Sequence, residues 1–314
     1  MKRALFIAGP TASGKSALSL KLAKDLNGVI INSDSMQVYS DLRVITARPS
    51  EEEEAQAPHR LYGYLDASEV SSAAGWAQDA MQEIEASWAQ DQTPIVIGGT
   101  GMYFKTLLDG MAVIPEIPND IRAGVRARCE AEGSEALHMD LQSVDPATAA
   151  RLFPGDSQRI CRALEVYEAT GKPISEWQAD TKPGPMQAVD DAGLLTKIVL
   201  DPPRDVLYDR CNRRFDLMLE TGAWQELDNL LARNLDPSLP LMRSLGVPSL
   251  AAYRRGELSL KDAIEDAKMQ TRRFAKRQLT WFRNQFGHWE RFPAQFSESE
   301  YRDFLNKKIT KAVD

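Results

Sequence analysis

The spacing of apolar residues in the N-terminal part of the chain predicts buried strands that alternate with helices. Short apolar runs, bounded by polar or glycine-rich segments, lie at residues 3–8, 29–31 and 93–97. Between the second and third runs, apolar residues recur at helical spacing, as at Ile84 and Trp88. This alternation is typical of a doubly wound parallel sheet, so we predict an α/β fold.

The pattern changes after Pro118. Residues 119–185 show only helical periodicity, and an apolar run at residues 195–200 then predicts a returning strand. We therefore predict a core that begins in residues 1–118, an all-helical insertion domain at 119–185, and completion of the core in residues 186–314. Helices are predicted at residues 51–54, 73–88, 121–132, 134–142, 146–152, 156–170, 201–219, 223–233, 247–253, 260–286 and 298–308.

Composition limits the class of protein without identifying it. The 314 residues are 43% hydrophobic and 26% charged, which is ordinary for a globular protein. No run of about 18 apolar residues occurs, so no membrane span is expected. A signal peptide is not expected either, because its cleavage would cut a loop described below. The three cysteines, Cys129, Cys161 and Cys211, fit no zinc or disulfide spacing and favour a cytoplasmic location.

The first apolar run leads into a phosphate-binding loop with the spacing G-x-x-x-x-G-K-S, and a helical pattern follows it. The loop comprises Gly9, Pro10, Thr11, Ala12, Ser13, Gly14, Lys15 and Ser16. Backbone N–H groups and the positive end of the helix would face linked phosphates, with Lys15 adding a charge and the Ser16 hydroxyl binding Mg²⁺. The loop leaves open whether a phosphoryl group is transferred or a pyrophosphate departs.

Polar residues also follow the second and third apolar runs, at the edge of a parallel sheet where ligands bind. Asp34 has three interpretations: a carboxylate that orders a metal ion, a general base, or a turn or helix cap. Residues 98–101 would bring backbone N–H groups and the Thr100 hydroxyl close to an anion. A P-loop ATPase usually has a carboxylate at the end of such a strand, so its absence counts against ATP hydrolysis.

Basic residues are concentrated locally although the net charge is −7. Residues 268–283 contain lysines and arginines but no acidic residue, with aromatic residues between them. This composition favours either amphipathic packing or contact with nucleic-acid phosphates. Arg213 and Arg214 follow the returning strand and would either clamp phosphates or form surface ion pairs. The polar side of the helix predicted around residues 158–162 would face a polyanion or solvent.

These motifs, in order along nearly the whole chain, resemble the bacterial tRNA isopentenyltransferase family, the tRNA dimethylallyltransferases. The motifs that carry the resemblance are G-P-T-A-S-G-K-S at 9–16, S-D-S-M-Q-V-Y at 33–39, P-H-R-L at 58–61, G-G-T-G-M-Y-F at 98–104, D-S-Q-R at 156–159, R-A-L-E at 162–165, T-R-R at 271–273 and A-K-R-Q-L-T-W at 275–281. Two stretches depart from the family pattern. Residues 41–49 replace a G-x-D-I-G-T-A-K-P-like segment, and residues 246–248 replace G-Y-R.

The resemblance implies a P-loop NTPase-like fold and a specific reaction. A dimethylallyl group would leave its pyrophosphate and join N6 of the adenosine on the 3′ side of a tRNA anticodon. Asp34 would be the base and Thr11 would lie at the prenyl-pyrophosphate channel. Pyrophosphate and Mg²⁺ would be held by Lys15, Ser16, Thr100 and Arg214. The helical insertion would clasp the anticodon loop.

The expected partners are the anticodon stem-loop of tRNA and dimethylallyl pyrophosphate, bound by a monomer. The residues expected to contact the stem-loop are Asp34, Ser35, Met36, Gln37, Thr100, Arg122, Gln158, Arg159, Ile160, Cys161, Arg162, Arg243, Ser244, Leu245, Gly246, Arg272, Lys276, Arg277 and Gln278. Two other functions stay open on the residues alone: a small-molecule kinase that uses ATP, and a nucleotide-dependent RNA-binding protein. The helical insertion and the basic stretch favour a macromolecular acceptor over a metabolite.

Overall fold

The computed structural model describes residues 2–293 and 297–306. The chain divides into two compact units: Met1–Leu108 together with Pro185–Asp314, and Asp109–Gly184. The first unit contains the sheet, whereas the elements of the second are helices. The predicted insertion at residues 119–185 starts later than the observed helical unit. The reason is that Ile117, in the extended segment before the first of its helices, is buried in that unit's core.

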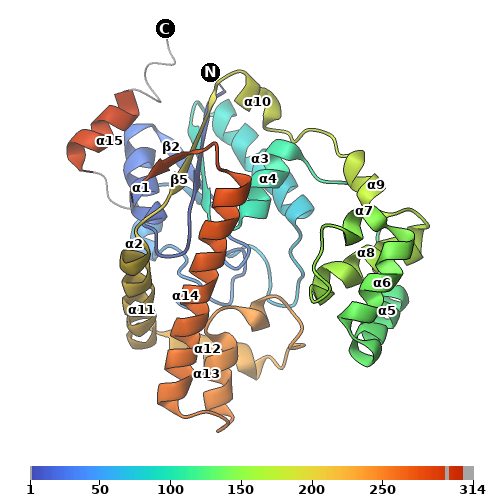
Figure 1. The fold of residues 1–314 in the computed structure, drawn as a ribbon. Helices are drawn as coiled ribbons and strands as arrows, with labels where there is room; N and C mark the ends of the chain where they lie inside the picture. The colour runs from blue at the N-terminus through green and yellow to red at the C-terminus, as the bar shows by residue number, and fades with distance from the viewer. Residues whose placement is uncertain (1, 294–296, 307–314) are drawn as a thin grey trace. The chain divides into compact units, whose positions relative to one another are not determined.

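A parallel six-stranded sheet forms the centre of the first unit, in the order β3-β2-β4-β1-β5-β6 (Figure 1). The strands are β1 (Ala4–Ala8), β2 (Gly28–Asn32), β3 (His59–Arg60), β4 (Thr93–Gly98), β5 (Leu195–Leu200) and β6 (Glu290–Phe292). The predicted doubly wound fold class is confirmed. The apolar pattern does not predict β3 or β6, because these short edge strands consist largely of charged and polar residues.

Helices of the first unit follow the predicted order, apart from two short ones at residues 187–191 and 241–243 that the pattern does not predict, and several begin at a serine cap. They are α1 (Lys15–Asp25), α2 (Glu51–Glu54), α3 (Ala73–Ala89), α4 (Gly101–Asp109), α10 (Gln187–Asp191), α11 (Arg204–Glu220), α12 (Ala223–Ala232), the 3₁₀ helix η1 (Leu241–Arg243), α13 (Val247–Arg254), α14 (Leu260–Gln285) and α15 (Glu298–Phe304). Ser50, Ser72 and Ser259 each accept a backbone N–H of the first turn, which explains where α2, α3 and α14 start. The prediction for the last helix extends to residue 308, and residues 307–308 lie outside the described part.

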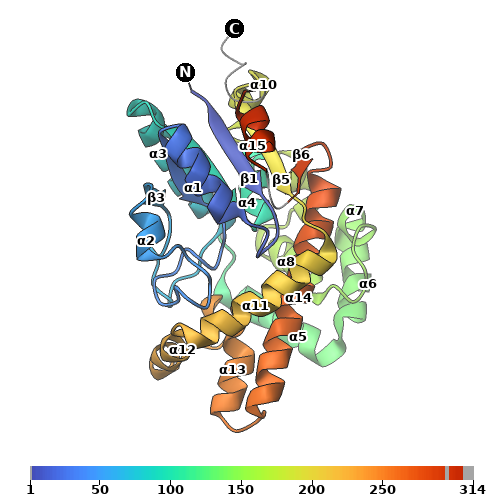
Figure 2. The same ribbon diagram turned by 90° about the vertical axis from the view of Figure 1, so that its left-hand side faces the viewer.

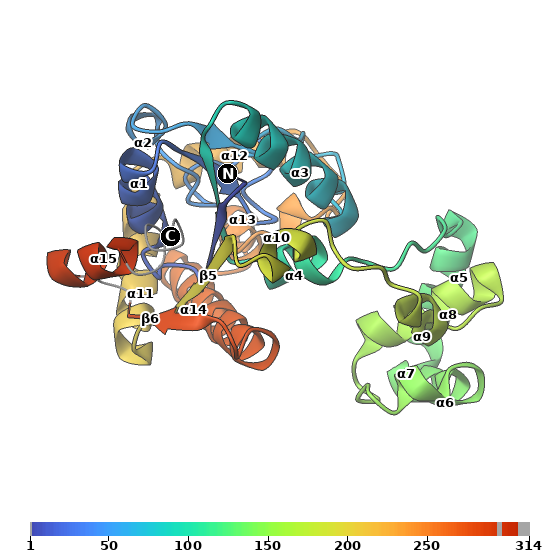
Figure 3. The ribbon, with the colours of Figure 1, turned by 90° about the horizontal axis from the view of Figure 1, so that it is seen from above.

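Alternating side chains of the central strands build a core on each face of the sheet. Phe6 packs in one core with Trp76 and Phe104, whereas its neighbour Ile7 packs in the other with Leu18 and Tyr301. Helices α3 and α4 cover the first face, and α1 and α15 cover the second (Figures 1 and 3). Burial on both faces is why the strands read as continuous apolar runs.

The carboxyl end of the sheet is where helices α11 to α14 gather. Figure 2 shows them beyond the end at which β1 leads into α1. Contacts between α11 and α14, and between α13 and α14, hold this group together. Residues from distant parts of the chain therefore meet at the edge where parallel sheets bind ligands.

The second unit is a helical bundle with its own core. Its helices are α5 (Asn119–Glu132), α6 (Ser134–Val144), α7 (Pro146–Ala149), α8 (Ser157–Thr170) and α9 (Ile174–Ala179). Val125, Leu137, Leu141, Ile160 and Leu164 are buried together in it. Among the described helices of both units, none is long and apolar enough to span a membrane.

Candidate active site

The loop between β1 and α1 folds around its own lysine. Gly14 has φ 93°, a left-handed conformation that favours glycine, and α1 begins at the next residue. Lys15 Nζ donates hydrogen bonds to the backbone oxygens of Gly9 at 2.9 Å and Pro10 at 2.7 Å. Ser16 is exposed in the first turn of α1 and lines the adjoining pocket. The loop thus places an ammonium and a hydroxyl at a helix N-terminus, as binding of linked phosphates requires.

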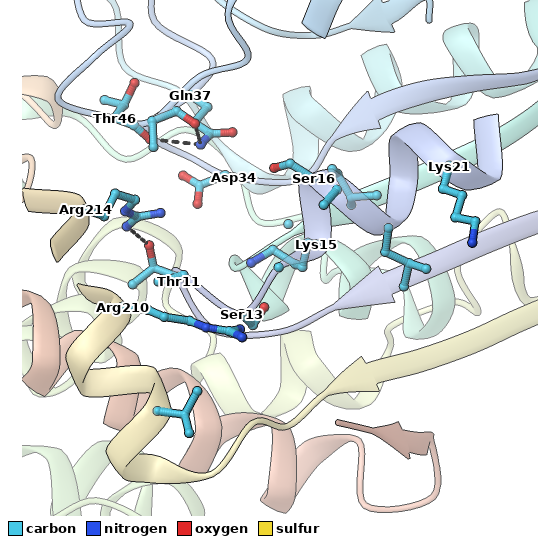
Figure 4. Close-up of a pocket in the computed structure, with 18 of the residues that line it drawn as sticks. Thr11, Ser13, Lys15, Ser16, Lys21, Asp34, Gln37, Thr46, Arg210 and Arg214 are labelled. Atoms are coloured by element: carbon cyan, nitrogen blue, oxygen red, sulfur yellow. Dashed lines mark hydrogen bonds between the residues drawn. The ribbon is translucent and has the colours of Figure 1, made fainter. Parts of the chain in front are cut away.

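The charge of Lys15 depends on its surroundings. The pKa of Lys15 is lowered to about 8, chiefly by burial; the negative charge of Asp34 opposes this shift and the positive charge of Arg214 adds to it. Arg214 is itself partly buried, and desolvation lowers the pKa of its guanidinium. Figure 4 shows Lys15, Arg214 and Asp34 around one space. Two cations face one carboxylate there, so an anionic ligand is favoured.

Asp34 is held by a turn at the end of β2. The Asn32 Oδ1 atom accepts the Asp34 N–H at 2.9 Å, and Asp34 Oδ1 accepts the Met36 N–H at 2.9 Å. The Trp76 indole donates to the Asn32 backbone oxygen at 2.9 Å. This turn agrees with the interpretation of Asp34 as a turn-forming residue, yet its carboxylate also lines both pockets described below. It is therefore available to a ligand.

Thr11 links the loop to two distant helices. The Arg214 guanidinium, on α11, donates to Thr11 Oγ1 (Figure 4). The Gln278 side chain, on α14, accepts the Thr11 N–H at 2.9 Å and donates to the Gly99 backbone oxygen at 2.9 Å. Gln278 is buried. The prediction that Gln278 contacts tRNA is therefore corrected, because its amide is already used inside the protein.

The glycine-rich segment after β4 allows close packing. A Cβ atom on Gly98, Gly99 or Gly101 would lie 1.9 Å from Ser33 O, 2.2 Å from Gln278 Nε2 and 2.0 Å from Trp281 Cζ3, respectively. The Thr100 N–H donates to Ser33 O at 3.1 Å, and the Thr100 hydroxyl contacts Ser35. The Thr100 N–H is thus used inside the protein and is not available to an anion, which corrects the prediction for this segment at Thr100.

Two adjacent pockets share Thr11, Asp34, Thr46 and Arg214. The first has a volume of about 910 Å³ and is lined by the phosphate-binding loop and by basic side chains from α1 and α11. The second has a volume of about 400 Å³ and a mixed apolar and basic lining. That lining includes Ser35, Met36, Ile45, Phe215, Met218, Arg243, Ser244, Leu245, Phe274 and Arg277. A site suited to bind anions therefore adjoins a more apolar one, and Asp34 lines both.

Several predicted tRNA contacts in the first unit lie around the second pocket. Arg243, Lys276 and Arg277 are exposed, whereas Ser244 and Gly246 are buried. Within the basic stretch, some charges are paired and are therefore not a free surplus. Lys268 pairs with Asp216 at 2.6 Å, Arg283 with Asp201 at 3.4 Å, and Arg272 donates to Asn212 Oδ1 at 2.6 Å.

In the helical unit, the predicted tRNA contacts on α8 include both exposed and buried side chains. Gln158 and Arg159 are exposed and Arg162 is partly exposed, whereas the side chains of Ile160 and Cys161 are buried in the core. Side-chain contacts of Ile160 and Cys161 with a nucleic acid are therefore excluded in this conformation. Arg122, on α5, is partly buried, and its Nε atom has no hydrogen-bond partner.

The structure also reveals pocket residues that sequence patterns miss. Arg210 lines the first pocket together with Arg214, one helical turn away on α11, and the i, i+4 spacing of the two arginines was the available signal. Thr46 and Ala47 line it from the segment that departs from the family pattern. Phe274 and Met218 give no signal beyond helical packing.

Fold and site together define a P-loop protein with an apolar pocket beside its phosphate loop and a helical insertion. The sequence model of the IPP transferase family matches residues 37–285, and the chain belongs to this family. The resemblance predicted from the motifs is confirmed. The chain is 51% identical over 285 residues to a tRNA dimethylallyltransferase of Methylobacterium nodulans, covering 91% of this chain and 93% of that protein. With the tRNA dimethylallyltransferase of Parvibaculum lavamentivorans, the identity is 48% over 312 residues, covering 99% and 96%.

Solved structures agree with this membership. The tRNA isopentenylpyrophosphate transferase of Bacillus halodurans is similar with a TM-score of 0.69 and 34% identity, covering 98% of this chain and 95% of that one. A eukaryotic dimethylallyltransferase solved acting on tRNA is similar with a TM-score of 0.78 and 28% identity, covering 99% of this chain and 77% of that one. The predicted enzyme class, a prenyltransferase, is confirmed over the kinase and the RNA-binding alternatives.

Proposed function

We propose that this protein transfers a dimethylallyl group from dimethylallyl pyrophosphate to N6 of the adenosine on the 3′ side of the anticodon in tRNA, releasing pyrophosphate. The observation that carries the proposal is the junction of the two pockets. Thr11, Asp34 and Arg214 line both the pocket of the phosphate loop and the apolar pocket beside it. A donor with a charged end and an apolar end matches this pair.

The residues at the junction have the chemistry that this transfer needs. As the bond between the allylic carbon and the phosphate oxygen attached to it breaks, the pyrophosphate gains charge that Lys15, Arg214 and the loop N–H groups stabilise. The N6 amine of adenine attacks the carbon and loses a proton, and the Asp34 carboxylate accepts it. The Thr11 hydroxyl, which accepts a hydrogen bond from Arg214, would lie beside the reacting carbon.

Mg²⁺ is part of the proposal. The described residues contain no group of three or more His, Cys, Asp or Glu side chains that would hold a metal alone. Mg²⁺ in phosphate sites commonly uses one or two protein oxygens and takes its other ligands from phosphates and water. The exposed Ser16 hydroxyl at the loop fits that role. When bound, Mg²⁺ would neutralise charge on the leaving pyrophosphate.

The acceptor is proposed to be the anticodon stem-loop. A base that reacts must leave its stack, at a cost of a few kcal/mol. The exposed Arg243 and Arg277 line the apolar pocket, and together with the exposed Lys276 next to Arg277 on α14 they would bind phosphates near the extruded base. On the helical unit, the exposed Gln158 and Arg159 would contact the same stem-loop. We also propose that the active form is a monomer in the cytoplasm, since the three cysteines fit no disulfide spacing.

The test is incubation of the purified protein with labelled dimethylallyl pyrophosphate, Mg²⁺ and an unmodified tRNA that carries adenosine at the target position. We expect the label on N6 of that adenosine and one pyrophosphate released per label. Label on free AMP and none on tRNA would overturn the proposal. A tRNA with guanosine at the target position is the matched control, and light scattering of the same sample tests the monomer.

A further inference from the structure

We propose that Glu226, on α12, is a positioning residue for the prenyl donor, acting through the loop of residues 43–47. This inference rests on the proposed function for the identity of the donor. Glu226 lines neither pocket, and no sequence motif includes it. Its carboxylate nevertheless holds the backbone of a segment whose side chains line both pockets.

The Glu226 carboxylate accepts hydrogen bonds from three successive backbone N–H groups. Glu226 Oε1 accepts the N–H groups of Arg43 at 2.9 Å and Val44 at 2.7 Å, and Oε2 accepts the Ile45 N–H at 3.0 Å. A carboxylate that accepts several N–H groups makes bonds about twice as strong as neutral ones. On the same helix face two turns later, Arg233 pairs with Asp41. Helix α12, with Arg233 directly after its last residue, therefore binds both the start of the loop and Asp41, two residues before it.

The loop of residues 43–47 forms one wall of both pockets, across from Thr11. Ile45 and Thr46 line the apolar pocket, and Thr46 and Ala47 line the phosphate pocket. The Gln37 amide donates to the backbone oxygens of Thr46 at 2.9 Å and Ala47 at 2.8 Å (Figure 4). The wall is thereby tied to the segment that carries Asp34.

The loop contains one strained backbone position. Ala47 has φ 55°, a left-handed conformation that costs a non-glycine residue about 1 kcal/mol. Residues 41–49 also depart from the family pattern, which has a glycine two residues before this alanine. The turn is closed by its own bonds from the Ala47 N–H to Val44 O at 3.0 Å and from the Arg48 N–H to Arg43 O at 2.9 Å, and Glu226 adds three contacts from outside the loop. Without them, the wall would shift at the point where the apolar end of the donor lies.

The experiment compares Glu226→Gln with Asp228→Asn, whose carboxylate on the same helix pairs with Arg254 at the surface. Hydrogen exchange of the intact protein measures directly whether the Glu226 carboxylate protects the backbone amides of residues 43–45. We expect amides 43–45 to exchange about tenfold faster in Glu226→Gln and at the normal rate in Asp228→Asn, with β1 and β4 unchanged in both. Steady-state kinetics should show a donor KM raised about fivefold or more, with tRNA affinity changed less than about twofold.

Each outcome decides the proposal. Faster exchange with an unchanged donor KM would make Glu226 a structural residue only, and unchanged exchange would remove the clamp; both overturn the inference. If Glu226→Gln loosens β4 as well, Glu226→Asp, which keeps the charge with a shorter reach, is measured in its place. Failure of the proposed function appears separately, as absence of prenylated tRNA with the wild-type protein, while the exchange data still test the clamp.

Discussion

Gln278 and Thr11, 267 residues apart in the chain, are joined by a 2.9 Å hydrogen bond from the Thr11 N–H to the Gln278 Oε1 atom. The other end of the same amide donates to Gly99 O at 2.9 Å. One buried side chain of α14 thus fixes the phosphate loop against the end of β4. The helix whose exposed face carries Lys276 and Arg277 is therefore connected directly to the donor site.

Replacing Gln278 with alanine should loosen the phosphate loop. The Thr11 N–H would lose its acceptor, which costs about 1–3 kcal/mol when the group stays buried. We expect a lower midpoint of thermal unfolding and a raised KM for dimethylallyl pyrophosphate, measured by calorimetry and initial rates. Thr280→Ala, at an exposed position on the same helix, is the control and should leave both values unchanged. An unchanged donor KM in Gln278→Ala would show that the contact does not position the loop.

Asp34→Asn tests the proposed base. The amide keeps the size of the side chain but accepts no proton, so turnover should fall by about 10²–10⁴-fold, the usual contribution of general base catalysis. Affinity for tRNA, measured by fluorescence anisotropy, should change little. The matched control is Glu85→Gln, an exposed carboxylate on α3. Near-normal turnover of Asp34→Asn would remove Asp34 from the chemistry.

The pH dependence of donor use should report Lys15. Its folded-state pKa of about 8 lies below the ordinary lysine value, so the ammonium is charged below pH 8 and is lost as the pH rises through it. Since pyrophosphate is bound better by the charged form, kcat/KM for the donor should decline above pH 8. Lys15→Arg, which stays charged over this range, should abolish that decline. A wild-type profile that stays flat to pH 10 would contradict the assignment.

Salt dependence should identify the basic residues that bind tRNA phosphates. Lys276 and Arg277 are exposed, so the double alanine variant should weaken tRNA binding and reduce the slope of log K against log salt by about 1.4–1.8. Lys268→Ala is the matched control. Lys268 is already paired with Asp216 at 2.6 Å and neutralises no tRNA phosphate, so its removal should leave the slope unchanged. Equal slopes for the double variant and the wild type would place the tRNA elsewhere.

Features that depend on residues close together in the chain could be predicted from the sequence. The spacing around Gly14, Lys15 and Ser16 predicts the phosphate loop, because a strand, a glycine turn and a helix form a local unit. Burial on both sheet faces produces the apolar runs that predict β1, β2, β4 and β5. The order of the motifs was enough to predict the family.

Contacts between these parts depend on the folded structure and could not be predicted from the sequence. The bond between Arg214 and Thr11 spans 203 residues, and Glu226 reaches the loop at residues 43–45 across more than 180. Such pairs have no periodicity and no motif, since each depends on where the packing of the core places two helices. For the same reason, sequence reasoning assigned Gln278 to tRNA, whereas burial of that face of α14 against the phosphate loop makes it an internal support.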